Sequence, residues 1–241
     1  MLTLRDVACV RGSGPESFTV RVDRLQISRG ETIAITGASG CGKSTLLEIL
    51  ALVLRPAVRD RFTWESASPG HGEQDIAVLW QRDAFSHLTR IRARRIGFVL
   101  QTGGLLPYLD VRSNIELARR IARLPSRGSP VPRLMDTLGL SHLDRKMPHQ
   151  LSVGERQRVS IARAMAHEPE LLLADEPTAA LDPELAEQVI ELMLELVERT
   201  QTTAVIVTHD RDRVRARVDR EIVAQPIAGE TGRGSCFGAA C

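Results

Sequence analysis

A glycine-rich stretch with one lysine carries the clearest chemistry in this sequence. Residues 37–45 fit the pattern G-x-x-x-x-G-K-[ST] of a phosphate-binding loop. In such a loop, backbone N–H groups surround a phosphate and the lysine ammonium reaches its oxygens as a compact point charge. Lys43 and Lys146 are the only lysines of an arginine-rich chain, so a lysine kept here indicates a place that a guanidinium does not suit. The residues expected to bind nucleotide phosphates are Gly37, Ala38, Ser39, Gly40, Cys41, Gly42, Lys43, Ser44 and Thr45.

Two acidic residues end an apolar segment far downstream. Residues 171–174 read Leu-Leu-Leu-Ala and are followed by Asp175 and Glu176. A strand buried on both faces must place its charges at its end, where ligands bind in α/β sheets. We therefore expect Asp175 to hold a magnesium ion together with Ser44, and Glu176 to polarise the attacking water. Two solvated acids at a strand end are the alternative, which the loop at 37–45 makes weak.

The elements that would position these residues follow from the apolar periodicity. The run at 32–36 reads as a buried strand that feeds the loop, and a helix over 44–54 opens directly from it. Strand, loop and helix in this order are the context of a phosphate loop. Asp182 and Pro183 have the residue types of an N-cap and a first helical position. Further strands are expected over 2–10, 18–27, 95–100, 170–174 and 203–208, and further helices over 110–123, 131–138, 152–167 and 183–199.

Two segments lack a clear period. Residues 55–94 are the least regular, with Trp64 and Trp80 expected on short strands on either side of a loop at 66–73. The tail over 226–241 is rich in Gly and Ala, and we expect it to be flexible.

The composition bounds the class of protein. The 241 residues are 43% hydrophobic and only 3% aromatic, so the core must consist mostly of Leu, Val, Ile and Ala. A net charge of +2 is too small to indicate a nucleic-acid partner. No stretch reaches the roughly 18–20 apolar residues of a membrane span, and the start lacks a signal-peptide layout, so we expect a cytoplasmic protein. Without C-x-x-C spacing, we expect reduced thiols at Cys9, Cys41, Cys236 and Cys241.

A further segment carries a family resemblance. Residues 151–158, Leu-Ser-Val-Gly-Glu-Arg-Gln-Arg, resemble the LSGGQ signature of the ATP-binding subunits of ABC transporters. Its continuation is similar in wording to the lipoprotein-release and macrolide-export type. Gln101 matches the Q-loop glutamine of the family, Asp182 its D-loop and His209 its switch histidine. The motifs stand in the family's order, and the resemblance covers residues 1–225.

The resemblance implies a fold and a site. It implies an α/β fold, a P-loop NTPase core with an N-terminal antiparallel β subdomain and an inserted α-helical subdomain at about 102–162. ATP and Mg²⁺ would bind between two head-to-tail copies. The catalytic residues would be Lys43, Gln101, Glu176 and His209, the magnesium ligands Ser44, Gln101 and Asp175, and the residues that reach the nucleotide from the opposite copy Ser152, Gly154 and Asp182.

The resemblance also implies partners. A motor subunit of this family acts through an integral-membrane permease, and residues 102–109, after Gln101, would contact a cytoplasmic helix of that permease. Internal packing of this apolar loop is the alternative. The chain would then be peripheral on the cytoplasmic face of the bacterial inner membrane, as a homodimer, with no nucleic-acid partner.

Two positions depart from the family pattern. Val153 replaces the first signature glycine, and a β-branched residue is tolerated there only if the position needs a negative φ. Relatives place an adenine-stacking aromatic where this chain has residues 8–12, which contain none. Arg11 could stack on the base or Val10 could merely cover it, so we expect weak discrimination between ATP and GTP.

Two other functions stay open. A soluble ABC ATPase acting on DNA or ribosomes usually carries two nucleotide domains or an insertion that this sequence lacks. A regulatory ABC subunit with little hydrolysis is favoured by Val153 alone and opposed by Glu176 and His209. The sequence leaves the cargo and the direction of transport undetermined.

Overall fold

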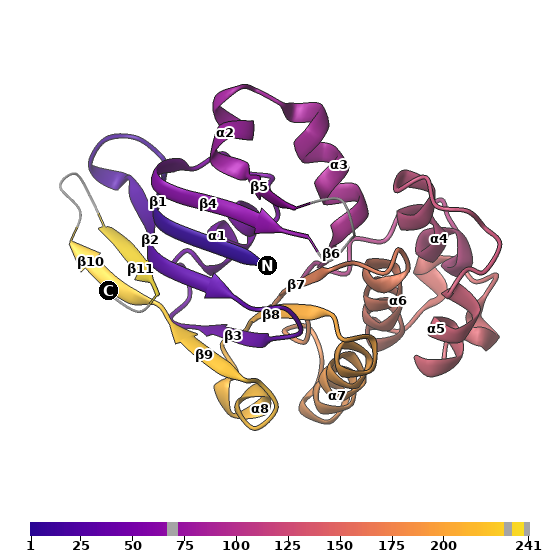
Figure 1. Cartoon of the computed structure of the whole chain (residues 1–241). Coiled ribbons are helices and arrows are strands. Elements are labelled where there is room, and N and C mark those ends of the chain that lie inside the picture. Colours follow the sequence, from indigo (N-terminus) through magenta and orange to yellow (C-terminus); the bar gives the residue numbers. More distant parts are fainter. Residues whose placement is uncertain (67–71, 229–232, 239–241) are drawn as a thin grey trace. The chain divides into compact units, whose positions relative to one another are not determined.

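The structure is a computed structural model that describes residues 1–66, 72–228 and 233–238. The chain forms two compact units, Met1–Thr89 with Val207–Cys241, and Arg90–Ile206. Each unit contains buried apolar side chains. Figure 1 labels the elements that build the two units. In the part of the chain that the structure describes, no helix is long and apolar enough to cross a membrane.

The first unit contains the expected β-sheet, in which every pairing but one is antiparallel. Its strands lie in the order β10-β11-β2-β1-β4-β5 (Figure 1). Strands β1 and β2 pair antiparallel from Leu2↔Ile27 onward, and alternate residues of β1 are buried, which is the pattern of a sheet with one face on a core. The bounds are Leu2–Arg11 for β1, Phe18–Ile27 for β2, Ala57–Glu65 for β4, Glu73–Asp75 for β5, Gln225–Ala228 for β10 and Arg233–Phe237 for β11.

The tail corrects the expectation of a flexible end. Strands β10 and β11 pair antiparallel, and β11 pairs parallel with β2 (Figure 1). Cys236 and Phe237 are buried, and Gly234 permits the close approach, since a Cβ there would lie 2.6 Å from the carbonyl oxygen of Thr19. The pairing is long-range, so the local composition did not indicate it. Residues 229–232 and 239–241 of the expected tail lie outside the described residues.

Cysteine chemistry follows the expectation in part. Cys9 and Cys41 are free thiols, as predicted. The prediction is wrong for Cys236, which is disulfide-bonded.

The first unit also holds the elements around the glycine-rich loop. Strand β3 (Thr32–Thr36) is buried at all five residues and pairs parallel with β9 (Arg220–Val223). Helix α1 (Lys43–Leu50) follows the loop and α8 (Arg211–Arg215) precedes β9. The prediction of strand, loop and helix in this order is therefore confirmed.

The irregular segment contains helices that the sequence did not predict. Trp64 lies on strand β4, as expected, but Trp80 lies in helix α2 (Ile76–Gln81), not on a strand. Asp75 caps α2 by accepting the N–H of Val78 at 3.0 Å. A second helix, α3 (Phe85–Arg95), follows. The residues 67–71 of the expected loop lie outside the described residues.

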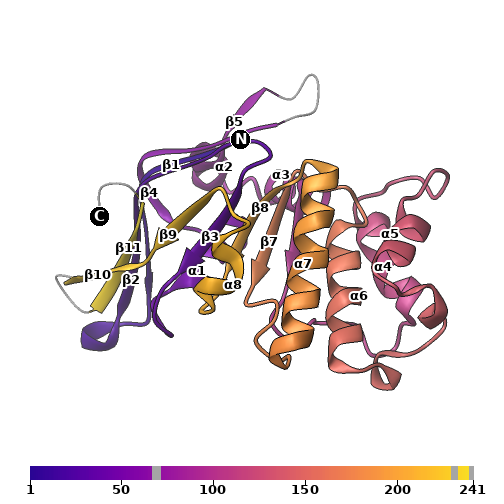
Figure 2. The ribbon, with the colours of Figure 1, turned by 90° about the horizontal axis from the view of Figure 1, so that it is seen from below.

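The second unit combines three strands with helices. Strands β6 (Ile96–Val99) and β7 (Leu171–Asp175) pair parallel, and β8 (Thr203–Val207) lies next to β7. Helix α4 packs on α6 and α6 on α7, as Figure 2 shows. The helix bounds are Val111–Ile121 for α4, Val131–Thr137 for α5, Val153–Met165 for α6 and Pro183–Thr200 for α7, with short 3-10 turns at Ser141–Leu143 and Pro148–Gln150.

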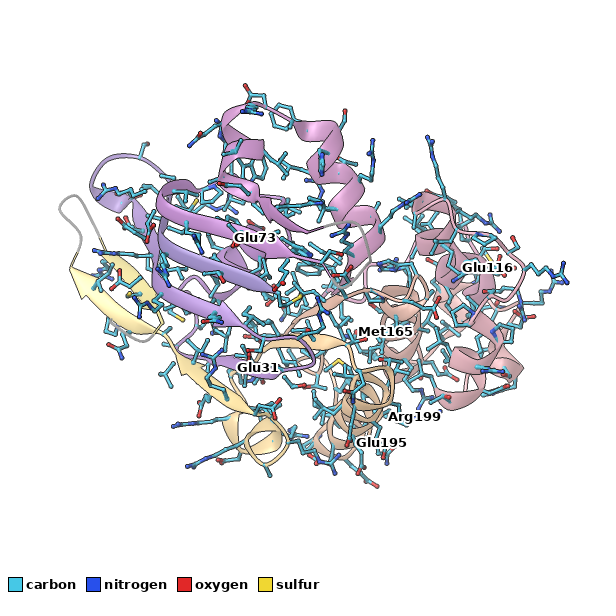
Figure 3. All side chains as sticks on the ribbon, viewed as in Figure 1. Glu31, Glu73, Glu116, Met165, Glu195 and Arg199 are labelled. Atoms are coloured by element: carbon cyan, nitrogen blue, oxygen red, sulfur yellow. The ribbon has the colours of Figure 1, made fainter. Side chains whose placement is uncertain are left out.

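Helix α7 begins as its sequence predicts. The carboxylate of Asp182 accepts the N–H of Leu185 at 3.0 Å, and Pro183 is the first helical residue. One face of α7 is buried in the core of the unit, and the opposite face carries the exposed Glu195 and Arg199, which Figure 3 labels. The amphipathic pattern thus fixes which side of the helix packs.

Candidate functional site

The loop between β3 and α1 has a backbone that only glycine accommodates. Gly40 and Gly42 have φ of 76° and 85°, in the left-handed region. A Cβ on Gly42 would lie 2.5 Å from Val20 and 3.0 Å from Phe18. The glycines therefore let the loop turn tightly against β2 while its next N–H groups open into α1.

The lysine of this loop is folded back onto the loop itself. Lys43 is 5% exposed, and its ammonium donates to the carbonyl oxygens of Gly37 at 2.9 Å and Ala38 at 3.0 Å. Its Nζ lies 4.0 Å from Sγ of Cys41. The ammonium is therefore in the middle of the loop, not in bulk solvent. Exposed residues beside it are Ala38, Ser39, Gly40 and Ser44, while Cys41 and Thr45 are half-buried.

His209 lies at the same end of the first unit's strands as the loop. The N–H of Thr208 donates to the carbonyl of Ile35 at 3.1 Å, so the backbone before His209 is tied to the strand that leads into Gly37. The hydroxyl of Thr208 accepts the N–H of Asp210 at 3.0 Å and holds the turn. The exposed His209 side chain therefore stands on a fixed turn.

The end of β3 is anchored by a carboxylate that the sequence did not point out. Thr36 donates its hydroxyl to Glu221 at 2.6 Å, and Arg211 donates to the same carboxylate at 2.7 Å. Burial acts to raise the pKa of Glu221, but these two hydrogen bonds and the positive charges of Arg211 and Arg215 together outweigh it and hold the pKa below its usual value. An ionised Glu221 thus fastens β9 and α8 to the strand that leads into the loop.

Arg11 has a partner that the sequence did not reveal. Its guanidinium pairs with the carboxylate of Glu48 on α1, and both side chains are nearly half exposed, 45% and 41%. Val10 beside it is 58% exposed. Arg11 is therefore held over the helix that follows the phosphate loop, and its stacking on a base stays a prediction.

In the second unit, the two acids stand where the sequence places them. The residues before Asp175 on β7 are fully buried, and Asp175 and Glu176 are half-buried at the strand's end. Glu176 has a φ of 44°, a left-handed conformation that is uncommon for a residue with a side chain. Backbone strain of this kind is concentrated at functional sites.

Gln101 follows β6 on an exposed turn. The loop after it is organised by Asn114 of α4, a fully buried amide that the sequence did not indicate. Asn114 accepts the N–H of Leu106 at 2.8 Å, and its own amide nitrogen lies 2.8 Å from the carbonyl oxygen of Leu109 and 3.1 Å from those of Leu106 and Asp110. The loop is thus fixed from within, while Tyr108 remains 71% exposed.

The signature residues form a reciprocal cap on α6. Ser152 accepts the N–H of Glu155 at 3.2 Å, and the Glu155 carboxylate accepts the N–H of Ser152 at 2.6 Å. This second bond is the main reason that the pKa of Glu155 lies below its usual value. Val153 is the first helical residue and its φ is not positive. The valine therefore fits without backbone strain.

The same unit brings the signature and the D-loop together. A Cβ on Gly154 would lie 2.5 Å from Leu185, so this glycine lets α6 approach α7 closely. The N–H of the same Leu185 is capped by Asp182. The structure therefore brings Gly37–Thr45 and His209 together in one unit, and Ser152, Gly154 and Asp182 together in the other, which also contains Gln101, Asp175 and Glu176.

The sequence matches the profile of a known protein family. A profile of the family described as ABC transporter matches residues 20–179, which is more than half of the chain. The chain belongs to the ABC transporter family. The predicted resemblance is thereby confirmed, and so is the fold class, because solved ABC cassettes share the fold.

Two family members that are similar in sequence differ in length. A putative ABC transporter ATP-binding protein of Mycoplasma pneumoniae, the MG065 homolog, is 39% identical over 77% of this chain and 37% of its own length. The lipoprotein-releasing system ATP-binding protein LolD of Hydrogenovibrio crunogenus is 39% identical over 82% of this chain and 81% of its own. This chain thus spans little more than a third of the first ABC protein and most of the second.

A solved ABC cassette resembles the chain closely. The dimeric structure of MJ0796, a bacterial ABC transporter cassette, covers 92% of this chain and 94% of its own with 31% identity and a TM-score of 0.77. A second structure of MJ0796, a post-hydrolysis state bound to ADP and Pi, gives 32% identity and a TM-score of 0.73 over the same shares.

Proposed function

We propose that this chain is the ATP-binding and ATP-hydrolysing motor subunit of a membrane ABC transporter complex. The observation that carries the proposal is the loop of Gly37–Thr45, with the ammonium of Lys43 held among the loop's own carbonyl oxygens. The family and the description of MJ0796 as a cassette that binds ADP and Pi support it.

The loop is suited to a triphosphate. Its N–H groups from Gly40 to Thr45 cradle the β-phosphate at the start of α1, where the helix dipole favours an anion. Lys43 exchanges two neutral carbonyl oxygens for charged phosphate oxygens, which are stronger acceptors for an ammonium. The positive charge thus moves to the β- and γ-phosphates as the nucleotide binds.

The proposed magnesium ligands fit an ion that arrives with the nucleotide. Within the residues that the structure describes, no cluster of three or more His, Cys, Asp and Glu side chains could hold a metal ion by itself. Mg²⁺ is commonly bound by one or two carboxylates together with substrate phosphates. The hydroxyl of Ser44, the amide oxygen of Gln101 and the carboxylate of Asp175 are oxygen donors of the kind it prefers. When bound, Mg²⁺ neutralises charge on the phosphates.

The remaining catalytic roles belong to two side chains on rigid backbone. Glu176 orients and polarises the attacking water, and its left-handed backbone is held by the buried strand before it. His209 donates to the γ-phosphate from the turn that Thr208 fixes. Because the transition state of phosphoryl transfer is loose, positioning and electrostatics are sufficient for catalysis.

We also propose that the active form is a head-to-tail homodimer. Ser152 and Gly154 lie at the start of α6, an anion site for the γ-phosphate held by the opposite copy, and Asp182 stands beside them. Ser152 uses its oxygen to accept the N–H of Glu155, so its own proton stays available for a phosphate oxygen. The dimeric MJ0796 cassette supports this arrangement.

An integral-membrane permease is the proposed partner. The second unit has an apolar groove of about 280 Å³ whose walls include Phe98, Leu117, Ile121 and the side chain of Arg163. Ile121 is 59% exposed, and the loop over 102–109 presents the exposed Tyr108. A cytoplasmic helix of a permease would cover these side chains and locate the chain on the cytoplasmic face of the membrane. No nucleic-acid partner is proposed.

The two alternatives to a motor subunit, a regulatory subunit and a soluble ABC ATPase, are not equally supported. Val153 was the one feature in favour of a regulatory subunit, and its unstrained position at the first turn of α6 removes that argument. A soluble ABC ATPase without a permease stays the second candidate.

The test compares the ATPase activity of the purified wild-type chain with that of the Glu176→Gln variant. Light scattering in the presence of ATP measures the molecular mass of each. We expect turnover in the wild type and an ATP-locked dimer in the variant. A variant that stays monomeric at saturating ATP would contradict the proposed mechanism.

A further inference from the structure

One arginine of the signature helix holds the turn that follows Gln101. Arg163 of α6 donates from Nη1 to the carbonyl oxygen of Gly104 at 2.8 Å and from Nη2 to that of Gly103 at 2.9 Å. Two consecutive carbonyls thus meet the two prongs of a single planar guanidinium. This geometry suits arginine and no other side chain, because only the guanidinium is a rigid fork of donors.

The turn is built so that its carbonyls can face Arg163. Gly103 and Gly104 both have positive φ, 74° and 57°. A Cβ on Gly104 would lie 2.6 Å from the side chain of Leu100. Both glycines are therefore favoured by the conformation of this turn, and Gly104 is required by space as well.

A second side chain of α6 holds the other flank of Gln101. Gln157 is buried, and its amide nitrogen lies 3.5 Å from the carbonyl oxygen of Leu100. Gln101 is thus bracketed by backbone groups that are attached to α6, one before it and two after it. The same helix begins at the signature residue Ser152.

The attachment is charged and only partly exposed to water, because the Arg163 side chain is half-buried. Burial lowers the pKa of Arg163, although an arginine remains protonated in proteins. Hydrogen bonds from a charged donor are stronger than those between neutral groups. The two carbonyls that Arg163 meets therefore give the turn a stiff connection to α6.

We propose that Arg163 is a positioning residue that couples the Q-loop to the signature helix, so that a displacement of Gln101 moves Ser152 with it. The inference rests on the proposed function, in which Gln101 responds to the nucleotide and Ser152 contacts the nucleotide of the opposite copy. Arg163 also lines the groove proposed for the permease helix. A helix seated there would contact the side chain that joins the two motifs.

The chain offers a matched control for this arginine. Arg119 of α4 is buried, more deeply than the half-buried Arg163, and it also donates to two backbone carbonyls, those of Ala166 at 3.0 Å and Pro125 at 2.8 Å. Neither acceptor belongs to the Q-loop. Arg119→Met therefore removes the same kind of bonds from the same unit without touching the turn after Gln101.

The first measurement is hydrogen exchange of the nucleotide-free chain. With Arg163→Met we expect amides of residues 102–106 to exchange about tenfold faster or more, since two charge-assisted hydrogen bonds are lost. Arg119→Met should leave that segment unchanged, and Arg163→Lys should be intermediate because an ammonium lacks the fork. Arg163→Lys also serves if the methionine variant does not fold. Equal exchange in wild type, Arg163→Lys and Arg163→Met would overturn the proposal.

The second measurement tests coupling, with each arginine variant in a Glu176→Gln background. Adding ATP and Mg²⁺ should slow exchange at residues 37–45 and 152–158 in the parent and in Arg119→Met. In Arg163→Met, slowing at 37–45 should persist and slowing at 152–158 should be lost. Retained slowing at 152–158 would overturn the proposal. A parent without any response would instead refute the proposed function, and the nucleotide-free exchange would still report the attachment by itself.

Discussion

Replacing Asn114 by Leu should detach the loop after Gln101 from α4. The side chains are similar in size, so the change removes polar contacts without opening a large cavity. Asn114 is fully buried and makes its two shortest bonds, both 2.8 Å, to the N–H of Leu106 and the carbonyl oxygen of Leu109. The carbonyls of Leu106 and Asp110 keep other donors, the N–H groups of Leu109 and residue 114 itself.

The magnitude follows from the two groups that lose their partner. Each buried backbone group left unsatisfied costs about 1–3 kcal/mol. Because the loop is partly exposed, water can reach these groups, and we expect the lower part of that range for each. The total should be about 2–4 kcal/mol of the free energy of unfolding.

The assay is urea denaturation followed by circular dichroism, with Arg120→Leu as the control. Arg120 lies on the same helix and pairs with Glu116 on the surface, so its loss should cost less than about 1 kcal/mol. A second readout is association with vesicles carrying the permease, which should weaken in Asn114→Leu. A loss below about 0.5 kcal/mol, equal to that of the control, would refute the account of the loop.

Three further outcomes are expected. Gly154→Ala should destabilise the chain because its Cβ meets Leu185 at 2.5 Å, and Leu185→Ala in the same chain should restore part of the loss; additive losses in urea denaturation would contradict this contact. The pKa of Glu155 is lowered in the folded state, so the carboxylate stabilises the fold above about pH 4.3 and this advantage is lost as pH falls through the lower folded pKa. Wild type should therefore lose stability relative to Glu155→Gln in that acidic window, and a constant difference from pH 7 to pH 3 would speak against the cap. Arg11→Tyr should release Glu48 and offer a ring to the base, raising the ratio of ATP to GTP turnover; an unchanged ratio would mean that the base does not reach this strand.

The sequence predicts an element well when the element depends on neighbouring residues, and poorly when it depends on contacts between residues far apart in the chain. Strands β2 and β3 and the start of α7 were predicted with their bounds, because alternation, an apolar run and an Asp-Pro cap are local signals. The sequence predicts a strand at Trp80, which lies in helix α2, because a short apolar run does not distinguish a strand from a helix. The sequence does not predict helix α3, because polar residues dominate that segment. The local composition predicts a flexible tail, because the strand that it pairs with, β2, lies far away in the sequence.

The residues of the candidate site also differ in whether local sequence or long-range contacts identify them. The types and spacing of Lys43, Asp175, Glu176 and their motifs predict the chemistry that we propose for this chain, because phosphate loops and strand-end acids are recognised from adjacent residues. Only the tertiary structure decided that Arg163 holds the two glycines after Gln101 and that Asn114 holds the loop beyond them. Hydrogen bonds between residues far apart in the chain depend on which backbone groups the fold leaves in need of a partner, and neither the arginine nor the asparagine differs in sequence from an ordinary surface residue.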